Sequence, residues 1–472
     1  MSVHSAASPH TPQLDPQSAA ARDIAHVLHP TTNLARHRAE GALIIERGEG
    51  IRVFDVHGRS YIEGLAGLWC AGFGFSEGEL VEAAVAQLRR LPFYHGFGNK
   101  AVLPTIDLAE RLKAIAPFPA SKVFFTNSGS EANDTQLKLI WYYNNAIGRP
   151  EKKKIIARKR GYHGVTVATA CLTGLPAFRN GFDLPLTGVL HADCPHYYRE
   201  ALPDESEDAF VARLVDNLEQ LILANGPETI AAFIAEPVMA GGGVIVPPAM
   251  YFEKVQRLLA HYDIVCIDDE VVCGFGRTGH MFGCESVGMR PDTMTVAKQL
   301  SAAYMPIAAV LLPERMYEVL VQESERRAVF GHGFTYGGHP VSAAVALRNL
   351  ELFEERRMLD HIRSVAPHFQ SRLRGFADHP LVGETRGVGL IGAIELVAHK
   401  GSRRPFEAAL GVGSRCAEYC IEQGLITRAS ADSILFCPPQ IITAQEIDEM
   451  FDRFGEALDR TAHWLRSIGQ HP

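Results

Sequence analysis

The sequence predicts an α/β fold with a large domain, in which helices flank a mostly parallel sheet, and a smaller α+β domain. Between about residues 75 and 340, short apolar runs alternate with helical stretches. Continuous apolarity indicates strands buried on both faces, and the helices between them imply crossovers between parallel strands. The chain has 472 residues, more than one hydrophobic core usually supports. We therefore expect more than one domain.

Four consecutive parts are expected along the chain. Residues 1–22, rich in Ser, Ala, Pro and His, are typical of a flexible N-terminal extension. Residues 23–72 include three short strands between 43 and 63, separated by glycine-containing turns, and we assign this antiparallel meander to the small domain. Residues 73–340 form the large α/β domain, and residues 341–472 form the C-terminal α+β part. The small domain is thus built from both ends of the chain.

Apolar runs mark the individual strands. In the large domain they lie at 122–126, 154–157, 231–235, 263–267 and 293–297. After residue 340 a long helical region precedes expected strands at 387–397, 425–429 and 434–438. The last helix should begin at Thr443, where Glu446 has the spacing of a capping box, and should end near Ile468.

Composition excludes several classes of protein. The formal charge of −8 gives no general attraction for nucleic acid or an anionic membrane. Nine scattered cysteines without a CxxC pair argue against a disulfide framework. The N-terminal residues lack the apolar segment of a secretory signal, and no stretch of about 18 apolar residues follows. We expect a soluble cytoplasmic protein.

Polar motifs follow the expected strands, at the sheet edge where open α/β folds bind ligands. After residues 122–126, Ser128, Gly129 and Ser130 open a helix, and their backbone N–H groups could bind an anion. Ser128 and Glu131 also have the spacing of a capping box, so an ordinary helix cap is the alternative. After residues 154–157, Tyr162 and His163 lie between glycines. Tyr162 could lie flat on a planar ligand, although an aromatic at a strand end more often serves packing.

A carboxylate cluster and a lysine follow the last strands of this series. Asp268, Asp269 and Glu270 come at the end of a buried strand, and three adjacent carboxylates there need a cation or strong hydrogen-bond donors. Lys298 follows the next strand, 29 residues after Asp269. A further carboxylate, Glu236, follows residues 231–235, where a cap or a salt bridge is the ordinary role.

These groups together describe a pocket for a flat, phosphorylated, cationic ring that bonds covalently to lysine. Pyridoxal 5′-phosphate (PLP) needs a phosphate site, a ring stack, an acid for its pyridine nitrogen and an amine for its aldehyde. Residue patterns alone leave open which of Asp268, Asp269 and Glu270 is that acid.

The motifs resemble a known family. TNSGSEAND (126–134), GYHG (161–164), Glu236-Pro237, DDEVVCGFGRTG (268–279), AKQLS (297–301) and GFTYGGHP (333–340) occur in the order typical of class III PLP-dependent aminotransferases. This resemblance covers residues 30 to 460 and implies the fold type I architecture, with a seven-stranded sheet. GLAGLWC (64–70), LPFY (91–94), CPHYYRE (194–200) and LITRA (425–429) are most similar to the amine:pyruvate branch, the ω-transaminases.

The resemblance implies roles for individual residues. Lys298 becomes the Schiff-base lysine and Asp269 the partner of the pyridine nitrogen. The implied cofactor-binding set also includes Ser128, Gly129, Ser130, Tyr162, His163, Glu236, Val271 and Thr335. The implied substrate-binding set is Trp69, Tyr94, Tyr162 and Arg428.

Two of these roles extend beyond cofactor chemistry. Thr335 would bind the phosphate in the other subunit, which implies a homodimer with shared active sites, possibly a tetramer. Arg428 would pair with a substrate carboxylate and move aside for an uncharged amine. Gln299 stands where many family members have glycine, and the sequence assigns it no role.

The implied activity moves an amino group from a primary amine or ω-amino acid to a keto acid, with pyruvate expected, by ping-pong Schiff-base chemistry. A decarboxylase, aminomutase or racemase of similar fold is the alternative. A more distant alternative is a metal-dependent enzyme that uses His191, Asp193, Cys194 and His196, whose spacing could bind zinc. We expect no resident metal, nucleic acid or membrane partner.

Overall fold

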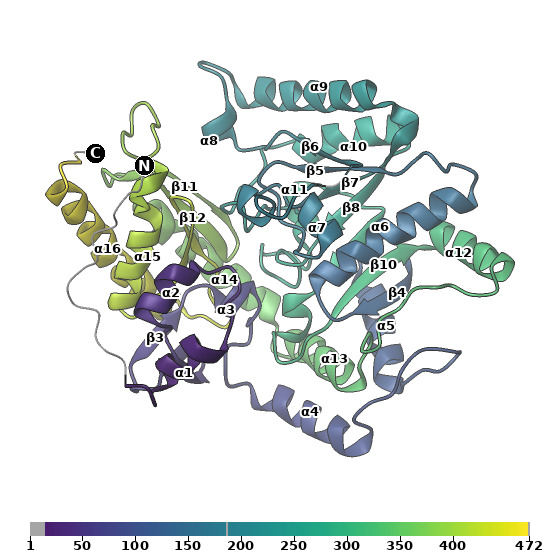
Figure 1. Cartoon of the computed structure of the whole chain (residues 1–472), viewed down its shortest axis with the longest axis horizontal. Helices are drawn as coiled ribbons and strands as arrows, with labels where there is room; N and C mark the ends of the chain where they lie inside the picture. Colours follow the sequence, from purple (N-terminus) through teal and green to yellow (C-terminus); the bar gives the residue numbers. More distant parts are fainter. Residues whose placement is uncertain (1–14, 186, 471–472) are drawn as a thin grey trace.

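A computed structural model describes residues 15–185 and 187–470. Most of the expected N-terminal extension, residues 1–14, lies outside these described residues. Its last residues begin helix α1 (Ala19–His26), for which Ser18 is the N-cap, and α2 (Leu34–Glu40) follows. Both short helices lie beside the part of the molecule that carries the chain's C-terminal helices (Figure 1).

The centre of the molecule is a seven-stranded sheet with the order β4-β10-β9-β8-β7-β5-β6. Strand β10 is antiparallel to both of its neighbours, and the other strand pairs are parallel. The expected mostly parallel sheet is therefore confirmed. Its strands are β4 (Ala120–Thr126), β5 (Lys154–Arg158), β6 (Val189–Ala192), β7 (Ile230–Ala235), β8 (Val265–Asp269), β9 (Thr293–Val296) and β10 (Ala308–Pro313).

Helices cover both faces of this sheet (Figure 1). All six residues of β7 are buried, as a strand between two helical layers requires. The helices are α4 (Gly78–Arg90), α5 (Leu103–Ile115), α6 (Gly129–Ala146), α7 (Val167–Leu172), α8 (Tyr197–Glu200), α9 (Glu207–Asn225), α10 (Tyr251–His261), α11 (Gly283–Val287), α12 (Glu314–Arg326) and α13 (Pro340–Glu355).

Two smaller sheets use both ends of the chain. One has the order β1-β2-β3-β13, with β1 (Ile45–Glu49), β2 (Arg52–Asp55) and β3 (Ser60–Glu63) as the expected meander and β13 (Leu425–Ile426) parallel to β3. The other has the order β11-β12-β15-β14, formed by β11 (Val382–Val388), β12 (Ile391–Leu396), β14 (Arg428–Ser430) and β15 (Ser433–Phe436). Segments from the two ends therefore pair directly. The residue limits expected for the domains remain predictions.

The single strand expected at 387–397 is wrong. The chain instead forms the hairpin β11–β12, with Gly387 paired to Gly392 across it. Gly389, in the turn, has a φ of +56°, a left-handed conformation that glycine adopts without strain. The run joins the last two residues of β11, the turn and β12, and its apolar residues continue through the turn, so the sequence pattern does not show the chain reversal.

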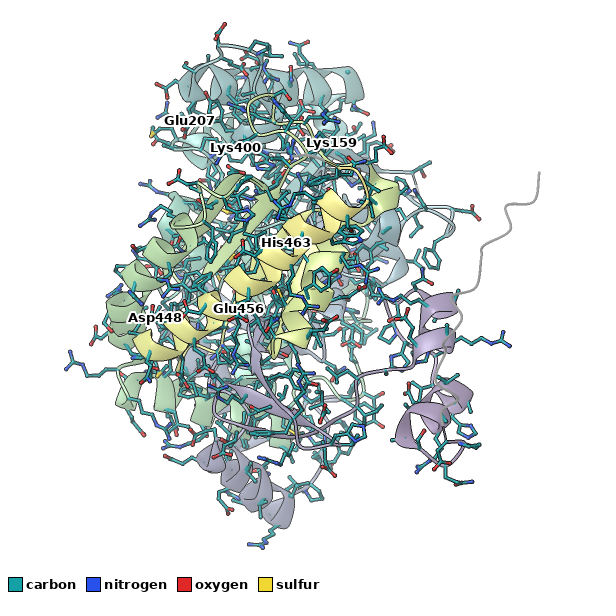
Figure 2. All side chains as sticks on the ribbon, turned by 90° about the vertical axis from the view of Figure 1, so that its left-hand side faces the viewer. Lys159, Glu207, Lys400, Asp448, Glu456 and His463 are labelled. Carbon is teal, nitrogen blue, oxygen red and sulfur yellow. The ribbon has the colours of Figure 1, made fainter. Side chains whose placement is uncertain are left out.

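The remaining helices pack around the small sheets. They are α3 (Ala66–Trp69), α14 (Met358–Arg374), α15 (Val412–Glu422) and α16 (Ala444–Ser467). The capping box at Thr443 and Glu446 is confirmed, and α16 crosses the face of the molecule shown in Figure 2. None of the helices in the described residues is long and apolar enough to cross a membrane.

Candidate active site

A cavity of about 500 Å³ lies at the carboxyl ends of the central strands. Eleven of the residues expected in the site line it, although they come from segments far apart in the chain. They are Trp69, Ser128, Gly129, Ser130, Tyr162, His163, Glu236, Asp269, Val271, Lys298 and Arg428. The structure thus brings together the phosphate cup, aromatic, acid and lysine that the sequence suggested.

Lys298 is the amine of this cavity. It follows β9, opens a short 3₁₀ turn (Lys298–Ser301), and has a φ of 48°, in the left-handed region that a lysine rarely adopts. Its side chain is exposed only in part, toward the cavity. Burial lowers the pKa of the amine, and Cys70, Asp269 and Glu236 oppose that shift in part. A neutral amine is thereby favoured, as a general base requires.

Asp269 is the carboxylate that reaches the cavity. Its Oδ2 accepts a hydrogen bond from Asn133 Nδ2 at 2.8 Å and lies 2.8 Å from His163 Nδ1. Its Oδ1 accepts from the backbone N–H of Val271 at 3.2 Å. Asn133 on α6 was missed in the sequence, although it lies one turn after Gly129 and so on the same helix face.

The other two carboxylates of the cluster serve a different place. Glu270 accepts hydrogen bonds from the backbone N–H groups of Gly283 (2.9 Å) and Cys284 (2.7 Å), and the Asp268, Glu270 and Cys284 side chains lie within 4.8 Å of one another. Burial raises the pKa of Glu270 to about 7, and burial beside Glu270 raises that of Asp268 well above its usual range. Backbone N–H donors and retained protons, rather than a cation, therefore reduce the repulsion between these carboxylates.

The start of α6 forms the expected cup. Ser128 caps the helix, its Oγ accepting from the N–H of Glu131 at 3.2 Å, while Glu131 accepts from Asn127 instead of completing the expected capping box. The first N–H groups of a helix have no partner within it, so those of Gly129 and Ser130 are available. A Cβ on Gly129 would lie 3.0 Å from a Val271 methyl group, so this position is tightly packed.

Tyr162 is held by Glu236. The Tyr162 N–H donates to Glu236 Oε1 at 2.9 Å, and the Ala240 N–H donates to Oε2 at 3.0 Å. Burial raises the pKa of Glu236. The Tyr162 side chain packs closely on Gly241, where an added Cβ would lie 3.2 Å from the Tyr162 Cβ. Glu236 therefore acts on the pocket by fixing the loop that carries the aromatic ring.

The chemistry of these groups fits PLP. Asn133 Oδ1 and His163 Nε2 are buried polar atoms without a hydrogen-bond partner among the described residues. The helix N-terminus suits a phosphate, Asp269 suits a protonated ring nitrogen, and Lys298 suits an aldehyde. No group in the cavity conflicts with such a ligand.

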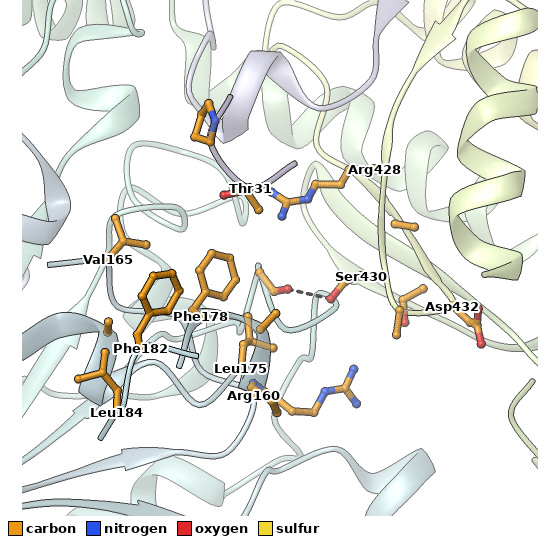
Figure 3. Close-up of a pocket in the computed structure, with 18 of the residues that line it drawn as sticks. Thr31, Arg160, Val165, Leu175, Phe178, Phe182, Leu184, Arg428, Ser430 and Asp432 are labelled. Carbon is orange, nitrogen blue, oxygen red and sulfur yellow. Dashed lines mark hydrogen bonds between the residues drawn. The ribbon is translucent and has the colours of Figure 1, made fainter. Parts of the chain in front are cut away.

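Arg428 lies between this cavity and a larger outer cavity of about 1320 Å³. Thr31, Leu175 and Phe178 also line both spaces, and Figure 3 shows the Arg428 side chain directed toward Thr31. The Arg428 side chain is exposed and forms no ion pair with the residues that the structure describes. Thr31, Leu175 and Phe178 lie in loops and a short 3₁₀ turn that no sequence pattern connects to the site.

Tyr94 and Thr335 lie outside the cavity of their own chain. Both are exposed, and Tyr94 stacks on His95 with ring centroids 4.9 Å apart. Thr335 lies in the loop between α12 and α13. Neither residue reaches the pocket of its own chain, so the roles expected for Tyr94 and Thr335 remain predictions.

The zinc alternative is not supported by the structure. His196 contacts Glu384 at 2.8 Å, Asp193 pairs with Lys159 at 2.8 Å, and His191 lies 3.2 Å from the Leu172 carbonyl oxygen. Burial raises the pKa of the Cys194 thiol to about 11. The two histidines and Asp193 are used in separate contacts, and the four residues do not form a group with ligand atoms within 4.8 Å of one another among the described residues.

Gln299, which the sequence left without a role, joins two segments of the site. Its Oε1 accepts a 2.8 Å hydrogen bond from the N–H of Gly72, three residues after Trp69, the last residue of α3. Its backbone carbonyl oxygen accepts from Asn349 Nδ2 at 2.8 Å. Gln299 thus joins the lysine segment to the segment that follows α3.

Comparison with known proteins decides the family. The family model described as aminotransferase class-III matches residues 34–458. The chain is a class III aminotransferase. This aminotransferase is 51% identical over 427 residues to the probable gamma-aminobutyrate transaminase 3, mitochondrial, of Oryza sativa subsp. indica, a match that covers 90% of this chain and 84% of that protein. It is 50% identical over 420 residues to the vanillin aminotransferase of Capsicum chinense, covering 89% of this chain and 92% of that protein.

A solved structure of another transaminase has the same fold as this chain. The omega transaminase from Pseudomonas jessenii in complex with PMP superposes with a TM-score of 0.94 at 54% identity, covering 95% of this chain and 99% of that chain. The expected fold class, the aminotransferase activity and the PLP cofactor are therefore confirmed for this class III aminotransferase.

Proposed function

We propose that this aminotransferase transfers amino groups from primary amines and ω-amino acids to pyruvate. The observation that carries the proposal is the Arg428 side chain, which lies at the cavity mouth without an ion pair among the described residues. An unpaired guanidinium there suits the carboxylate of pyruvate, which it can bind through two parallel hydrogen bonds. The large outer cavity gives it room to move aside for an uncharged amine.

The proposed roles follow the positions of the residues. Lys298 would hold the cofactor covalently and Asp269 would face its ring nitrogen, with His163 and Asn133 fixing the carboxylate. The cofactor, when bound, supplies an aldehyde that accepts the amino group and a ring that withdraws electrons from the reacting carbon. The phosphate would lie at Ser128, Gly129 and Ser130, with Tyr162 over the ring, Val271 beneath it and Trp69 toward the substrate.

Lys298 would also move the proton that the reaction requires. Its Nζ is the basic atom of the cavity, and the lowered pKa leaves it neutral more often than an exposed lysine. The acidic groups near it, Asp269 and Glu236, are both held by hydrogen bonds from backbone or side-chain donors. Lys298 would therefore be the base that takes up the proton of the substrate and releases it again.

The relatives support both parts of the donor range. Their names refer to γ-aminobutyrate, an ω-amino acid, and to vanillin, an aromatic aldehyde. A carboxylate-bearing donor would use Arg428, whereas an aromatic one would use the apolar wall at Leu175 and Phe178. Both classes of substrate are included in the proposal.

An amine panel tests the proposal. The purified enzyme is given γ-aminobutyrate or an arylalkylamine with pyruvate, and alanine is measured, while 2-oxoglutarate serves as the competing acceptor. We expect alanine from both donors. Preference for 2-oxoglutarate would contradict the pyruvate assignment. Product formed without any keto acid would instead indicate a decarboxylase, aminomutase or racemase.

We further propose a homodimer in which Thr335 serves the partner's phosphate site. Its support is the exposed place of Thr335, outside the cavity of its own chain. The variants Lys298→Ala and Thr335→Asp should each be inactive. When they are mixed and exchange subunits, part of the activity should return, because one of the two sites of each mixed dimer then has both native residues. No recovery despite proven exchange would contradict shared sites. Size-exclusion chromatography with light scattering distinguishes a dimer from a tetramer.

A cytoplasmic location completes the proposal. It is supported by the described cysteines, which form no disulfide and so fit a reducing compartment. Relatives are named as mitochondrial or chloroplastic, so other compartments are the competing outcomes. Cell fractionation with an antibody to the chain distinguishes them.

A further inference from the structure

Three groups of side chains in the described residues bring possible metal-ligand atoms within 4.8 Å of one another. In the group of His196, Glu384 and Glu395, the carboxylates already pair with Arg386 and Arg199, so a second cation would be repelled. The remaining groups are Asp268-Glu270-Cys284 and Asp23-His29-His37.

The group of Asp268, Glu270 and Cys284 is also unsuitable. All three residues are buried, and raised pKa values favour the protonated forms that do not bind metal. Glu270 is further occupied by two backbone N–H groups. Only the group near the N-terminus is both accessible and free of a competing cation.

Asp23, His29 and His37 converge from three segments. Asp23 lies on α1, His29 in the following loop and His37 on α2. The Nε2 atoms of both histidines lie 2.8 Å from the same oxygen, Asp23 Oδ2, and the two ring centroids are 4.2 Å apart. Two imidazoles aimed with the same nitrogen at one carboxylate oxygen form a compact set of two nitrogens and one oxygen.

The helices around this group lack a hydrophobic core. Neither α1 nor α2 has a buried residue, and Val27, Leu28 and Leu34 are exposed. Figure 2 shows these helices, in purple, at the edge of the molecule. A segment with so little packing is ordered mainly by polar contacts, and in small units of this kind a bound metal commonly supplies the missing stability.

We propose that Asp23, His29 and His37 form a binding site for one divalent ion of the zinc class. Neutral imidazole and carboxylate are ordinary ligands of Zn²⁺, and such a three-residue set leaves a coordination position for water. The side chains of His29, Asp23 and His37 are 27%, 16% and 8% exposed, so the ion can enter from solvent.

The site also has a connection to the active cavity. Thr31, between His29 and α2, lines both the inner and the outer cavity. An ion that holds His29 to α1 and α2 would fix the loop carrying Thr31 at the cavity mouth. Metal occupancy would then protect this loop from opening.

Zinc titration of the full-length, PLP-loaded enzyme tests the proposal. After chelator treatment and dialysis, isothermal titration with Zn²⁺ should show one site per chain. His29→Ala and Asp23→Asn should each weaken the affinity for Zn²⁺ more than about tenfold. Even the loss of a residue that only hydrogen-bonds to a metal ligand commonly has an effect of this size. The matched control, His463→Ala, removes an exposed histidine of α16 and should bind as the native enzyme does.

Two further readouts keep the result unambiguous. Co²⁺ in place of Zn²⁺ should give visible ligand-field bands that His37→Ala abolishes, and proteolysis at residues 27–33 should slow when Zn²⁺ is present. Absence of zinc binding by the native enzyme, or equal binding by His29→Ala, would overturn the site. Zinc binding without a change in proteolysis would overturn the loop's stabilisation.

Discussion

Gln299 Oε1 accepts a 2.8 Å hydrogen bond from the backbone N–H of Gly72, and both residues lie behind the cavity that Lys298 and Trp69 line. Gln299 is almost fully buried. A Cβ on Gly72 would overlap the Gln299 amide, so position 72 must be glycine while the Gln299 side chain lies here. The contact is therefore specific to this pair.

The first prediction concerns this pair. Gln299→Ala removes the side-chain acceptor of the buried Gly72 N–H, which keeps only the Cys70 carbonyl oxygen at 3.0 Å, and should lower the free energy of unfolding by about 0.5–1.5 kcal/mol. Gly72→Ala should also destabilise, because the added methyl group meets the Gln299 side chain. The double variant should lose less stability than the two single variants together. Once the Gln299 side chain is removed, the methyl group at position 72 no longer meets it. Chemical denaturation of the four proteins measures this coupling, and strict additivity would contradict it.

Lys298→Ala is the second prediction. The variant should fold, because the side chain ends in a cavity and not in the core, but it should lose the visible absorption of the lysine-linked cofactor. Turnover should fall by at least about 10²-fold, the usual contribution of a general base. Alanine formation and circular dichroism measure the two properties. Lys113→Ala, an exposed lysine on α5, is the control and should keep full activity.

Much of the site could be predicted from the sequence because a parallel sheet brings its strand ends to one edge. Lys298, Asp269 and Tyr162 each follow an apolar run, so their proximity follows from topology. The choice of Asp269 over Asp268 and Glu270 came from the resemblance. The structure gives its physical reason, since Glu270 faces the backbone of α11 and Asp269 faces Asn133 and His163.

Other parts of the fold and the site depend on long-range contacts, which local sequence patterns do not predict. Strand β6 (Val189–Ala192) is a half-exposed edge strand of four residues, too short for a clear apolar run. Thr31 reaches the cavity only through the path of the α1–α2 loop, and Gln299 acquires a partner 227 residues earlier in the chain. Tertiary packing alone determines such relationships.

Arg428 gives the third prediction. Arg428→Ala should lower kcat/KM for pyruvate by about 10- to 150-fold, since a charge-assisted hydrogen bond contributes about 1.5–3 kcal/mol. The half-reaction with an uncharged arylalkylamine should change little, because that substrate has no carboxylate. Single-turnover rates with each substrate measure the difference. Arg374→Ala, an exposed arginine on α14, serves as the control, and equal losses for both substrates would rule out a carboxylate-binding role.

The fourth prediction concerns the buried acids behind the site. Burial and the neighbouring Glu270 raise the pKa of Asp268 far above its unfolded value of about 4, so the folded state keeps a proton that the unfolded state releases. Its contribution to the free energy of unfolding is fully present below about pH 4. That contribution is lost as the pH rises from there toward the raised pKa of the folded state. Stability should therefore decline between about pH 5 and 8.

Asp268→Asn removes this proton difference with little change in side-chain volume. The free energy of unfolding should then fall less steeply between pH 5 and 8, by at most about 1.4 kcal/mol per pH unit, the value for one proton. Urea denaturation at several pH values measures the slope. Asp216→Asn, at an exposed position on α9, should keep the native slope. An unchanged slope in Asp268→Asn would mean that Asp268 is ionised in the folded protein, and Glu270, whose pKa burial raises to about 7, would then be the group that holds the proton.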